Sequence, residues 1–108
     1  MNLNEEVGIT VISDQLAEEC NELAHVCMKL SRKLRGENPT PVRYSKIIEN
    51  LHEEISDVVL CIDLLEEKKF IDSKQIDIWK ENKRRRWIRR LEEHHKNKSD
   101  RKGENNDR

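Results

Sequence analysis

The chain has 108 residues, of which 40% are charged, 34% hydrophobic and only 4% aromatic. This length allows one domain. Because apolar residues are few, a single chain would have a thin core, and we therefore expect a helical dimer or higher assembly. The net charge of −1, from 21 basic and 22 acidic residues, predicts no partner by bulk charge. No apolar run is long enough to span a membrane and residues 1–6 lack a signal peptide's pattern, so we expect a cytoplasmic protein.

The first predicted helix runs from about residue 10 to residue 35. Residues 1–10 are polar and expected to be loose, and Thr10, Ser13 or Asp14 is expected to cap the helix. Apolar or small side chains then recur in alternating steps of four and three, which is typical of an amphipathic helix and not of a strand. The two cysteines on this stripe are interpreted as small core residues. The stripe is Leu16, Cys20, Leu23, Cys27, Leu30 and Leu34.

The sequence Arg-Gly-Glu-Asn-Pro-Thr-Pro at residues 35–41 separates this helix from the next. Gly36 suits the position just after a helix, Thr40 can cap the following helix, and Pro41 fits its first turn. The second predicted helix spans about residues 41–68 and shows the same alternating steps. Its stripe is Tyr44, Ile48, Leu51, Ile55, Val58, Ile62 and Leu65.

Two pairs of acidic side chains lie beside these stripes. Glu19 and Glu22 each come one residue before a stripe position, and Glu54 and Asp57 do the same in the second helix. At about 100° per residue, both pairs lie on the same-handed flank of their stripes. If the helices pack antiparallel, stripe to stripe, the four carboxylates gather on one side of the seam, roughly 20 Å from the turn.

Four carboxylates this close raise one another's pKa values unless a cation neutralises them. A site of carboxylate oxygens alone suits Mg²⁺, with Mn²⁺ as the alternative. In a chain so rich in charge, a single Glu-x-x-Glu is usually a solvated helix face. Two pairs with the same offset and matching heights favour a metal site instead, formed by Glu19, Glu22, Glu54 and Asp57.

A third helix is predicted over residues 73–95, capped by Asp72 or Ser73. One of its faces changes from apolar to basic along the helix. Such a face suits a helix whose second half approaches an anionic site. The face holds Ile76, Trp79, Lys83, Arg86 and Arg90. In the other interpretation the basic residues are solvated and the packing face is formed by Trp87, Ile88 and Leu91. Both stay open. Residues 96–108 have no apolar content and are expected to form a disordered polar tail after a helical domain of residues 1–95.

The acidic motifs in a helical hairpin resemble the MazG-like family of all-α nucleoside triphosphate pyrophosphohydrolases. The resemblance covers about residues 10–92 and is carried by Glu-Glu-x-x-Glu from Glu18, the loop at residues 35–41, and Leu-His-Glu-Glu-Ile-Ser-Asp-Val at residues 51–58. It implies an all-α fold: an antiparallel helical hairpin plus a third helix, assembled as a homodimer or homotetramer into a helical bundle. It also implies magnesium-dependent cleavage of a nucleoside triphosphate between its α and β phosphates.

By position, the resemblance makes Glu19, Glu22, Glu54 and Asp57 the metal ligands. Glu18 matches the leading Glu of the motif, where it would act in catalysis by helping to activate water. Basic residues on the helix after the second motif meet the phosphates in this family; Lys83 and Arg86 match best, followed by Lys80 and Arg90. The gap between Glu22 and Glu54 is long for the family, and the segment before the first motif is short.

The expected partners are thus a nucleoside triphosphate and further copies of the chain, with no membrane, and nucleic acid is disfavoured. Other readings remain open: a more restricted substrate such as dUTP, dCTP or phosphoribosyl-ATP, or a helical interaction protein without catalysis. A different class again is nucleic-acid binding through the basic segment 83–90, with Trp87 stacking on a base.

Overall fold

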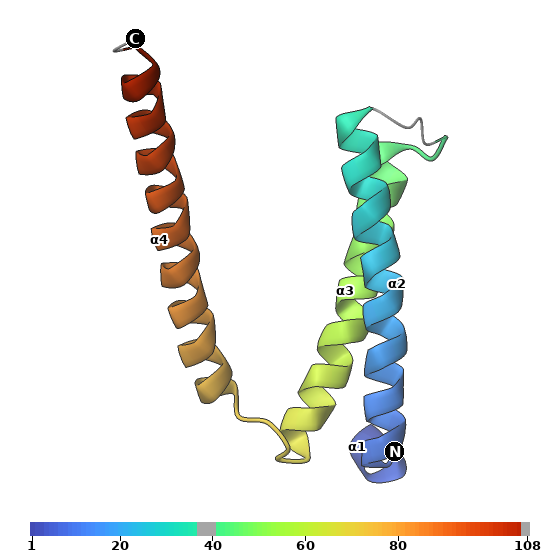
Figure 1. The fold of residues 1–108 in the computed structure, drawn as a ribbon. Coiled ribbons are helices and arrows are strands. Elements are labelled where there is room, and N and C mark those ends of the chain that lie inside the picture. Colours follow the sequence, from blue (N-terminus) through green and yellow to red (C-terminus); the bar gives the residue numbers. More distant parts are fainter. Residues whose placement is uncertain (37–40, 107–108) are drawn as a thin grey trace. The chain divides into compact units, whose positions relative to one another are not determined.

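The computed structural model describes residues 1–36 and 41–106, and every regular element in those ranges is a helix (Figure 1). The helices are α1 (Leu3–Glu6), α2 (Ile9–Arg35), α3 (Tyr44–Glu67) and α4 (Ser73–Asn106). The all-α class and the helical hairpin are therefore confirmed. In the same ranges, no helix combines the length and the apolar character that crossing a membrane requires. The chain divides into two units, Met1–Ile71 and Asp72–Arg108.

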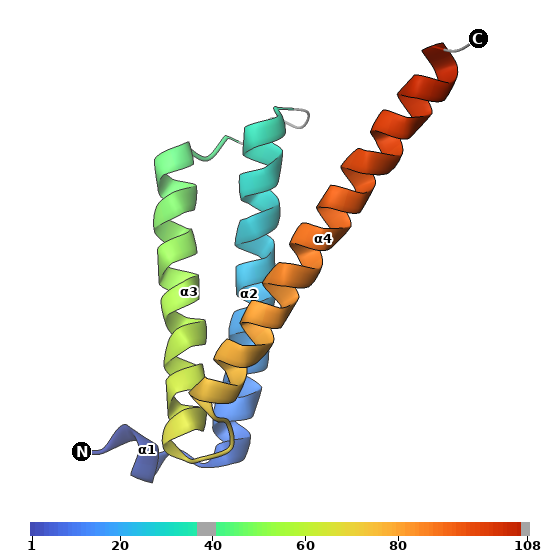
Figure 2. The ribbon, with the colours of Figure 1, turned by 90° about the vertical axis from the view of Figure 1, so that its left-hand side faces the viewer.

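The first unit is a hairpin of two long antiparallel helices, α2 and α3, which lie side by side in both views (Figures 1 and 2). Gly36 ends α2 in the left-handed conformation (φ 70°), where its amide donates to the carbonyl of Arg32, as predicted for this glycine. Pro41 precedes α3, which begins only at Tyr44. The predicted cap Thr40 lies outside the described residues.

The N-terminal segment is tied to the far end of α3 and is not loose as predicted. Asn2 caps the short helix α1 by accepting a hydrogen bond from the amide of Asn4. The side-chain amide of Asn4 donates to Glu67 (2.9 Å), and Lys68 donates to the Asn4 carbonyl (2.7 Å). The predicted side-chain cap of α2 is also wrong, because Gly8 occupies that position and offers no side chain.

The seam between α2 and α3 is shifted by one residue from the predicted stripe at several points. Ile12, Ile47, Cys61 and Leu64 are the buried apolar side chains of the described residues, and both isoleucines are 1% exposed. The predicted core positions Cys20, Cys27, Leu34, Tyr44 and Ile55 are exposed instead.

The shift has a simple origin: each helix carries two overlapping apolar stripes. The seam of α2 steps through Ile12, Leu16, Glu19, Leu23, Val26 and Leu30, whose side chains are buried or half-buried. In α3 the matching series is Ile47, Leu51, Glu54, Val58, Cys61 and Leu65. Both series keep the four-three alternation, and both place a glutamate in the seam. The prediction kept the acidic residues out of the contact between the two helices, and it therefore took the wrong stripe as the buried one.

The leftover stripe forms an exposed apolar face on the hairpin, defined by Cys20, Cys27, Leu34, Tyr44, Ile55 and Val59. At about 100° per residue, this face lies on one flank of the seam while Glu22 and Asp57 lie on the other. The acids and the exposed apolar face therefore occupy opposite broad sides of the hairpin.

The second unit is the single helix α4. Asp72 caps it by accepting a hydrogen bond from the amide of Lys74 (3.0 Å), as predicted. The expected helix end near residue 95 is wrong, since residues 96–106 are helical. Extending a helix that is already formed adds one backbone hydrogen bond for each residue, without the cost of forming a new first turn. The division of the chain at residue 95 stays a prediction.

Candidate metal centre

Three carboxylates from the two hairpin helices meet at the middle of the seam. Glu19 of α2 and Glu54 and Asp57 of α3 each offer an oxygen, and these oxygens lie within 4.8 Å of one another. Glu19 and Glu54 are half-buried seam residues, whereas Asp57 is exposed one turn further along. The predicted gathering of acids from both helices is therefore found for these three residues, although two of them lie in the seam and not beside it.

Glu19, Glu54 and Asp57 form an acidic triad. Glu54 is the member whose hydrogen-bonding groups are least satisfied. Its Oε2 atom is buried and has no hydrogen-bond partner among the described residues. Its carboxyl pKa is raised to about 7, first by loss of water around it, then by a hydrogen bond with Glu19 and by the charges of Glu19, Asp57 and Glu22. A hydrogen bond between two carboxyls requires that one of them keeps its proton.

The pKa values of Asp57 and of the neighbouring Cys61 thiol are also raised. Loss of water raises the pKa of Asp57, with further contributions from Glu19 and Glu53. Burial raises the pKa of the Cys61 thiol, and the charges of Glu19 and Asp57 add to this effect. The protein supplies acidic oxygens in excess here, which is an environment suited to a divalent cation.

Glu22 and Glu18 take different positions from the triad. Glu22 is exposed and lies outside the group of oxygens within 4.8 Å, yet it is close enough for its charge to raise the pKa of Glu54. Glu18 is exposed on α2. The ligand role of Glu22 and the catalytic role of Glu18 stay predictions.

Gln15 is a site residue that the sequence reasoning missed. Its side-chain amide donates to Oε1 of Glu19 at 2.7 Å, one turn before the acid. It also lines an apolar pocket of about 240 Å³, together with Val11, Leu60 and Cys61 and with Leu3 and Val7 of the N-terminal segment. The spacing of Gln15 and Glu19, four residues apart on one helix, is the signal that would have found it.

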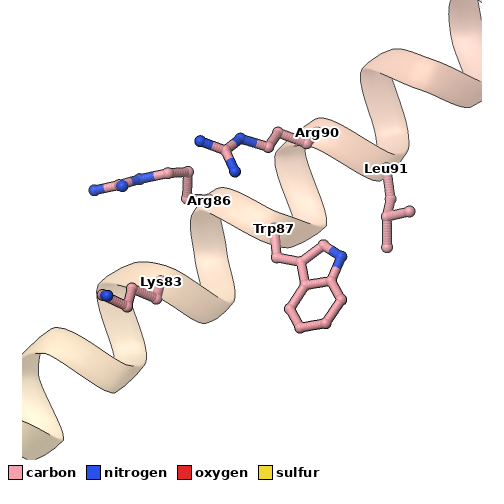
Figure 3. Close-up of a pocket in the computed structure, with 5 residues that line it drawn as sticks. All are labelled: Lys83, Arg86, Trp87, Arg90 and Leu91. Atoms are coloured by element: carbon pink, nitrogen blue, oxygen red, sulfur yellow. The ribbon is translucent and has the colours of Figure 1, made fainter. Parts of the chain in front are cut away.

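The predicted phosphate-binding residues lie on α4 and belong to the second unit. Lys83, Arg86 and Arg90 point to one side of the helix, while Trp87 and Leu91 point to the other (Figure 3). These five side chains line a shallow hollow of about 390 Å³. Lys80 forms an exposed ion pair with Asp77 (3.5 Å). All of them are exposed, and their role toward phosphate stays a prediction.

Comparisons with protein-family models, with curated proteins and with solved structures give no match for this chain. A function is therefore inferred from the residues themselves and from the resemblance of their motifs.

The raised pKa of Glu54 predicts how the stability of the metal-free chain depends on pH. The unfolded chain ionises Glu54 near the ordinary value of 4.5, whereas the folded chain holds the proton until about pH 7. The contribution to stability is full below pH 4.5 and is lost as the pH rises through 7. We expect the free energy of unfolding of the wild type, relative to that of Glu54→Gln, to fall between these pH values.

Urea unfolding of both proteins in a chelating buffer, followed by circular dichroism, measures this difference. Asp57, whose pKa is raised in the same direction, is present in both proteins and largely cancels in the comparison. A difference that is flat across this range would show that Glu54 ionises normally in the hairpin.

Proposed function

We propose that this chain is a magnesium-dependent nucleotide pyrophosphohydrolase that converts nucleoside triphosphates or deoxynucleoside triphosphates to the monophosphate and pyrophosphate. The observation that carries the proposal is the acidic triad, in which two helices converge on a carboxyl whose buried oxygen has no hydrogen-bond partner in the described part of the chain. This donor set fits a hard divalent cation such as Mg²⁺ or Mn²⁺. The choice of reaction rests on the resemblance of both acidic motifs to the MazG-like family.

In this proposal Glu19, Glu54 and Asp57 hold the cation, with Glu22 completing the set. A bound Mg²⁺ supplies charge neutralisation at phosphate oxygens and a more acidic water. Glu18 accepts a proton from the attacking water, and Gln15 keeps the Glu19 carboxylate in position through its hydrogen bond. The apolar pocket beside Gln15 suits the base of the nucleotide, because its walls are almost entirely aliphatic.

The basic residues of α4 would neutralise the phosphates. Lys83, Arg86 and Arg90 form no hydrogen bond or ion pair with any residue of the described ranges, so their charges are available to a ligand. By the resemblance to the MazG-like family, positive side chains on this helix would stabilise the charge that develops on the departing pyrophosphate. Lys80 takes a secondary role, since it already pairs with Asp77.

The proposal includes self-assembly through the exposed apolar face of the hairpin. Leu34 is 68% exposed and Ile55 is 43% exposed, which is costly in water at about 25 cal/mol per Å² of apolar surface. A second copy that packs against this face forms a four-helix bundle. Because Glu22 and Asp57 lie on the opposite broad side, such an assembly leaves that side of the triad open to substrate.

A nucleotide panel with pyrophosphate release as the readout tests the proposal. We expect turnover of triphosphates in Mg²⁺ or Mn²⁺, release of pyrophosphate and not of single phosphates, and background rates in a chelating buffer. A panel that includes dUTP, dCTP and phosphoribosyl-ATP separates a broad from a restricted substrate range. Release of orthophosphate would show a different bond cleaved, and no turnover of any compound would favour the non-catalytic interaction protein.

A further inference from the structure

The central part of α4 carries far more positive charge than one triphosphate needs. Residues 80–90 hold seven basic side chains against one acidic side chain, Glu81, a net charge of +6. The whole unit from residue 72 to residue 108 has 13 basic and 8 acidic residues (+5), whereas residues 1–71 have 8 and 14 (−6). The net charge of −1 for the whole chain is therefore the sum of an acidic first unit and a strongly basic helix.

Most of these charges have no internal partner. Lys80 pairs with Asp77 (3.5 Å) and Arg85 pairs with Glu81 (3.0 Å). The other five form no hydrogen bond or ion pair with a residue of the described part of the chain; they are Lys83, Arg84, Arg86, Arg89 and Arg90. Like charges on neighbouring turns repel one another, so an external anion stabilises this segment.

The unpaired charges surround the helix and do not form a single face. Arg84 and Arg86 are two residues apart, about 200° round the helix axis. Lys83, Arg86 and Arg90 share one side, as Figure 3 shows, and Arg84 lies on the opposite side from Arg86. A compact ligand such as a triphosphate reaches one side of the helix only. A long anion that bends around the helix reaches both.

Trp87 lies in the middle of this basic segment and is 70% exposed. It points away from Lys83, Arg86 and Arg90 and stands beside Leu91 (Figure 3). Together with Ile88, these side chains line a second hollow, of about 530 Å³, whose rim includes Lys80, Lys83 and Arg84. A flat aromatic ring with cations at its edges suits a ligand that carries both phosphates and planar bases.

We propose that α4 binds single-stranded nucleic acid without sequence specificity, with Trp87 stacking on a base and the five unpaired cations contacting phosphates. A membrane surface is the weaker match, because a membrane-bound helix needs one continuous apolar face. On α4 the side that carries the exposed Trp79 and Trp87 is interrupted by lysines at residues 80 and 83. Lys83, Arg86 and Arg90 are shared with the proposed hydrolysis. Arg84 and Arg89 have no role in that reaction, so substitutions at these two residues separate the two functions.

Fluorescence anisotropy of the full chain with labelled oligonucleotides of about 20 nucleotides, longer than typical sites of ~4–16 nucleotides, tests the proposal. Both oligothymidine and oligouridine are used, in a chelating buffer. With five phosphate contacts, the logarithm of the association constant should fall against the logarithm of salt concentration with a slope of roughly −3.5. Trp87→Ala should weaken binding about 5- to 150-fold, whereas Trp87→Phe should retain most of it.

Two charge variants, both checked for helix content, complete the design. Arg84→Gln with Arg89→Gln should reduce the slope by roughly 1.4 and leave nucleotide hydrolysis unchanged, whereas the matched pair Lys74→Gln with Lys98→Gln should change binding much less. No binding at about 50 mM salt would overturn the proposal. So would tighter binding to phosphatidylserine vesicles, or binding of inorganic polyphosphate as tight as that of oligonucleotides and equally insensitive to Trp87→Ala.

Discussion

Glu54→Gln is expected to reduce metal-dependent pyrophosphate release by about 100-fold or more, because it removes a ligand worth several kcal/mol of transition-state stabilisation. The same substitution should make the metal-free chain more stable than the wild type at pH 8. The reason is that a neutral amide replaces a carboxylate held against Glu19, Asp57 and Glu22. Lower activity with higher stability is the combination that distinguishes a ligand from a residue that merely supports the fold.

The measurement pairs the hydrolysis assay with thermal unfolding, with and without Mg²⁺. Ligand binding at 100 times Kd stabilises the folded state by about 2.7 kcal/mol, so Mg²⁺ should raise the Tm of the wild type and leave that of Glu54→Gln unchanged. Glu66→Gln is the matched control, since Glu66 is exposed on the same helix and lies outside the triad. Near-normal activity of Glu54→Gln would show that the ligand assignment is wrong.

Ile55→Lys is expected to dissociate the proposed assembly into monomers. Ile55 is 43% exposed within the chain and is not part of the buried core, so the helices should persist after the substitution. It places a charge on the exposed apolar face, where burial against a second copy costs several kcal/mol. We expect the dissociation constant of the assembly to rise at least about 100-fold, at 1.4 kcal/mol for each factor of ten.

Sedimentation or light scattering over a range of protein concentrations measures this effect, and circular dichroism checks that the helices remain. Met28→Lys is the matched control, because Met28 is exposed on α2 but is absent from the exposed apolar face. A monomeric wild type, or an Ile55→Lys protein of wild-type mass, would show that this face does not mediate assembly.

Local signals in the sequence predicted the helices well. The glycine at residue 36 ends α2 and the aspartate at residue 72 caps α4, because each acts through its own backbone or through an amide two residues away. The end of α4 was predicted too early, since a lack of apolar residues does not by itself end a helix that is already formed. The Gly8 cap of α2 was missed because glycine has no polar side-chain atom that would indicate a cap.

The sequence by itself determined two long amphipathic helices, a turn between them, and acids spaced to share one level of the hairpin. It could not decide which of two overlapping stripes forms the seam, because both obey the same periodicity. Only the packing of α2 against α3 decided this, when it buried Ile12 and Ile47 and left Ile55 exposed. That choice places Glu19 and Glu54 within the seam, where loss of water and mutual repulsion raise the pKa of Glu54.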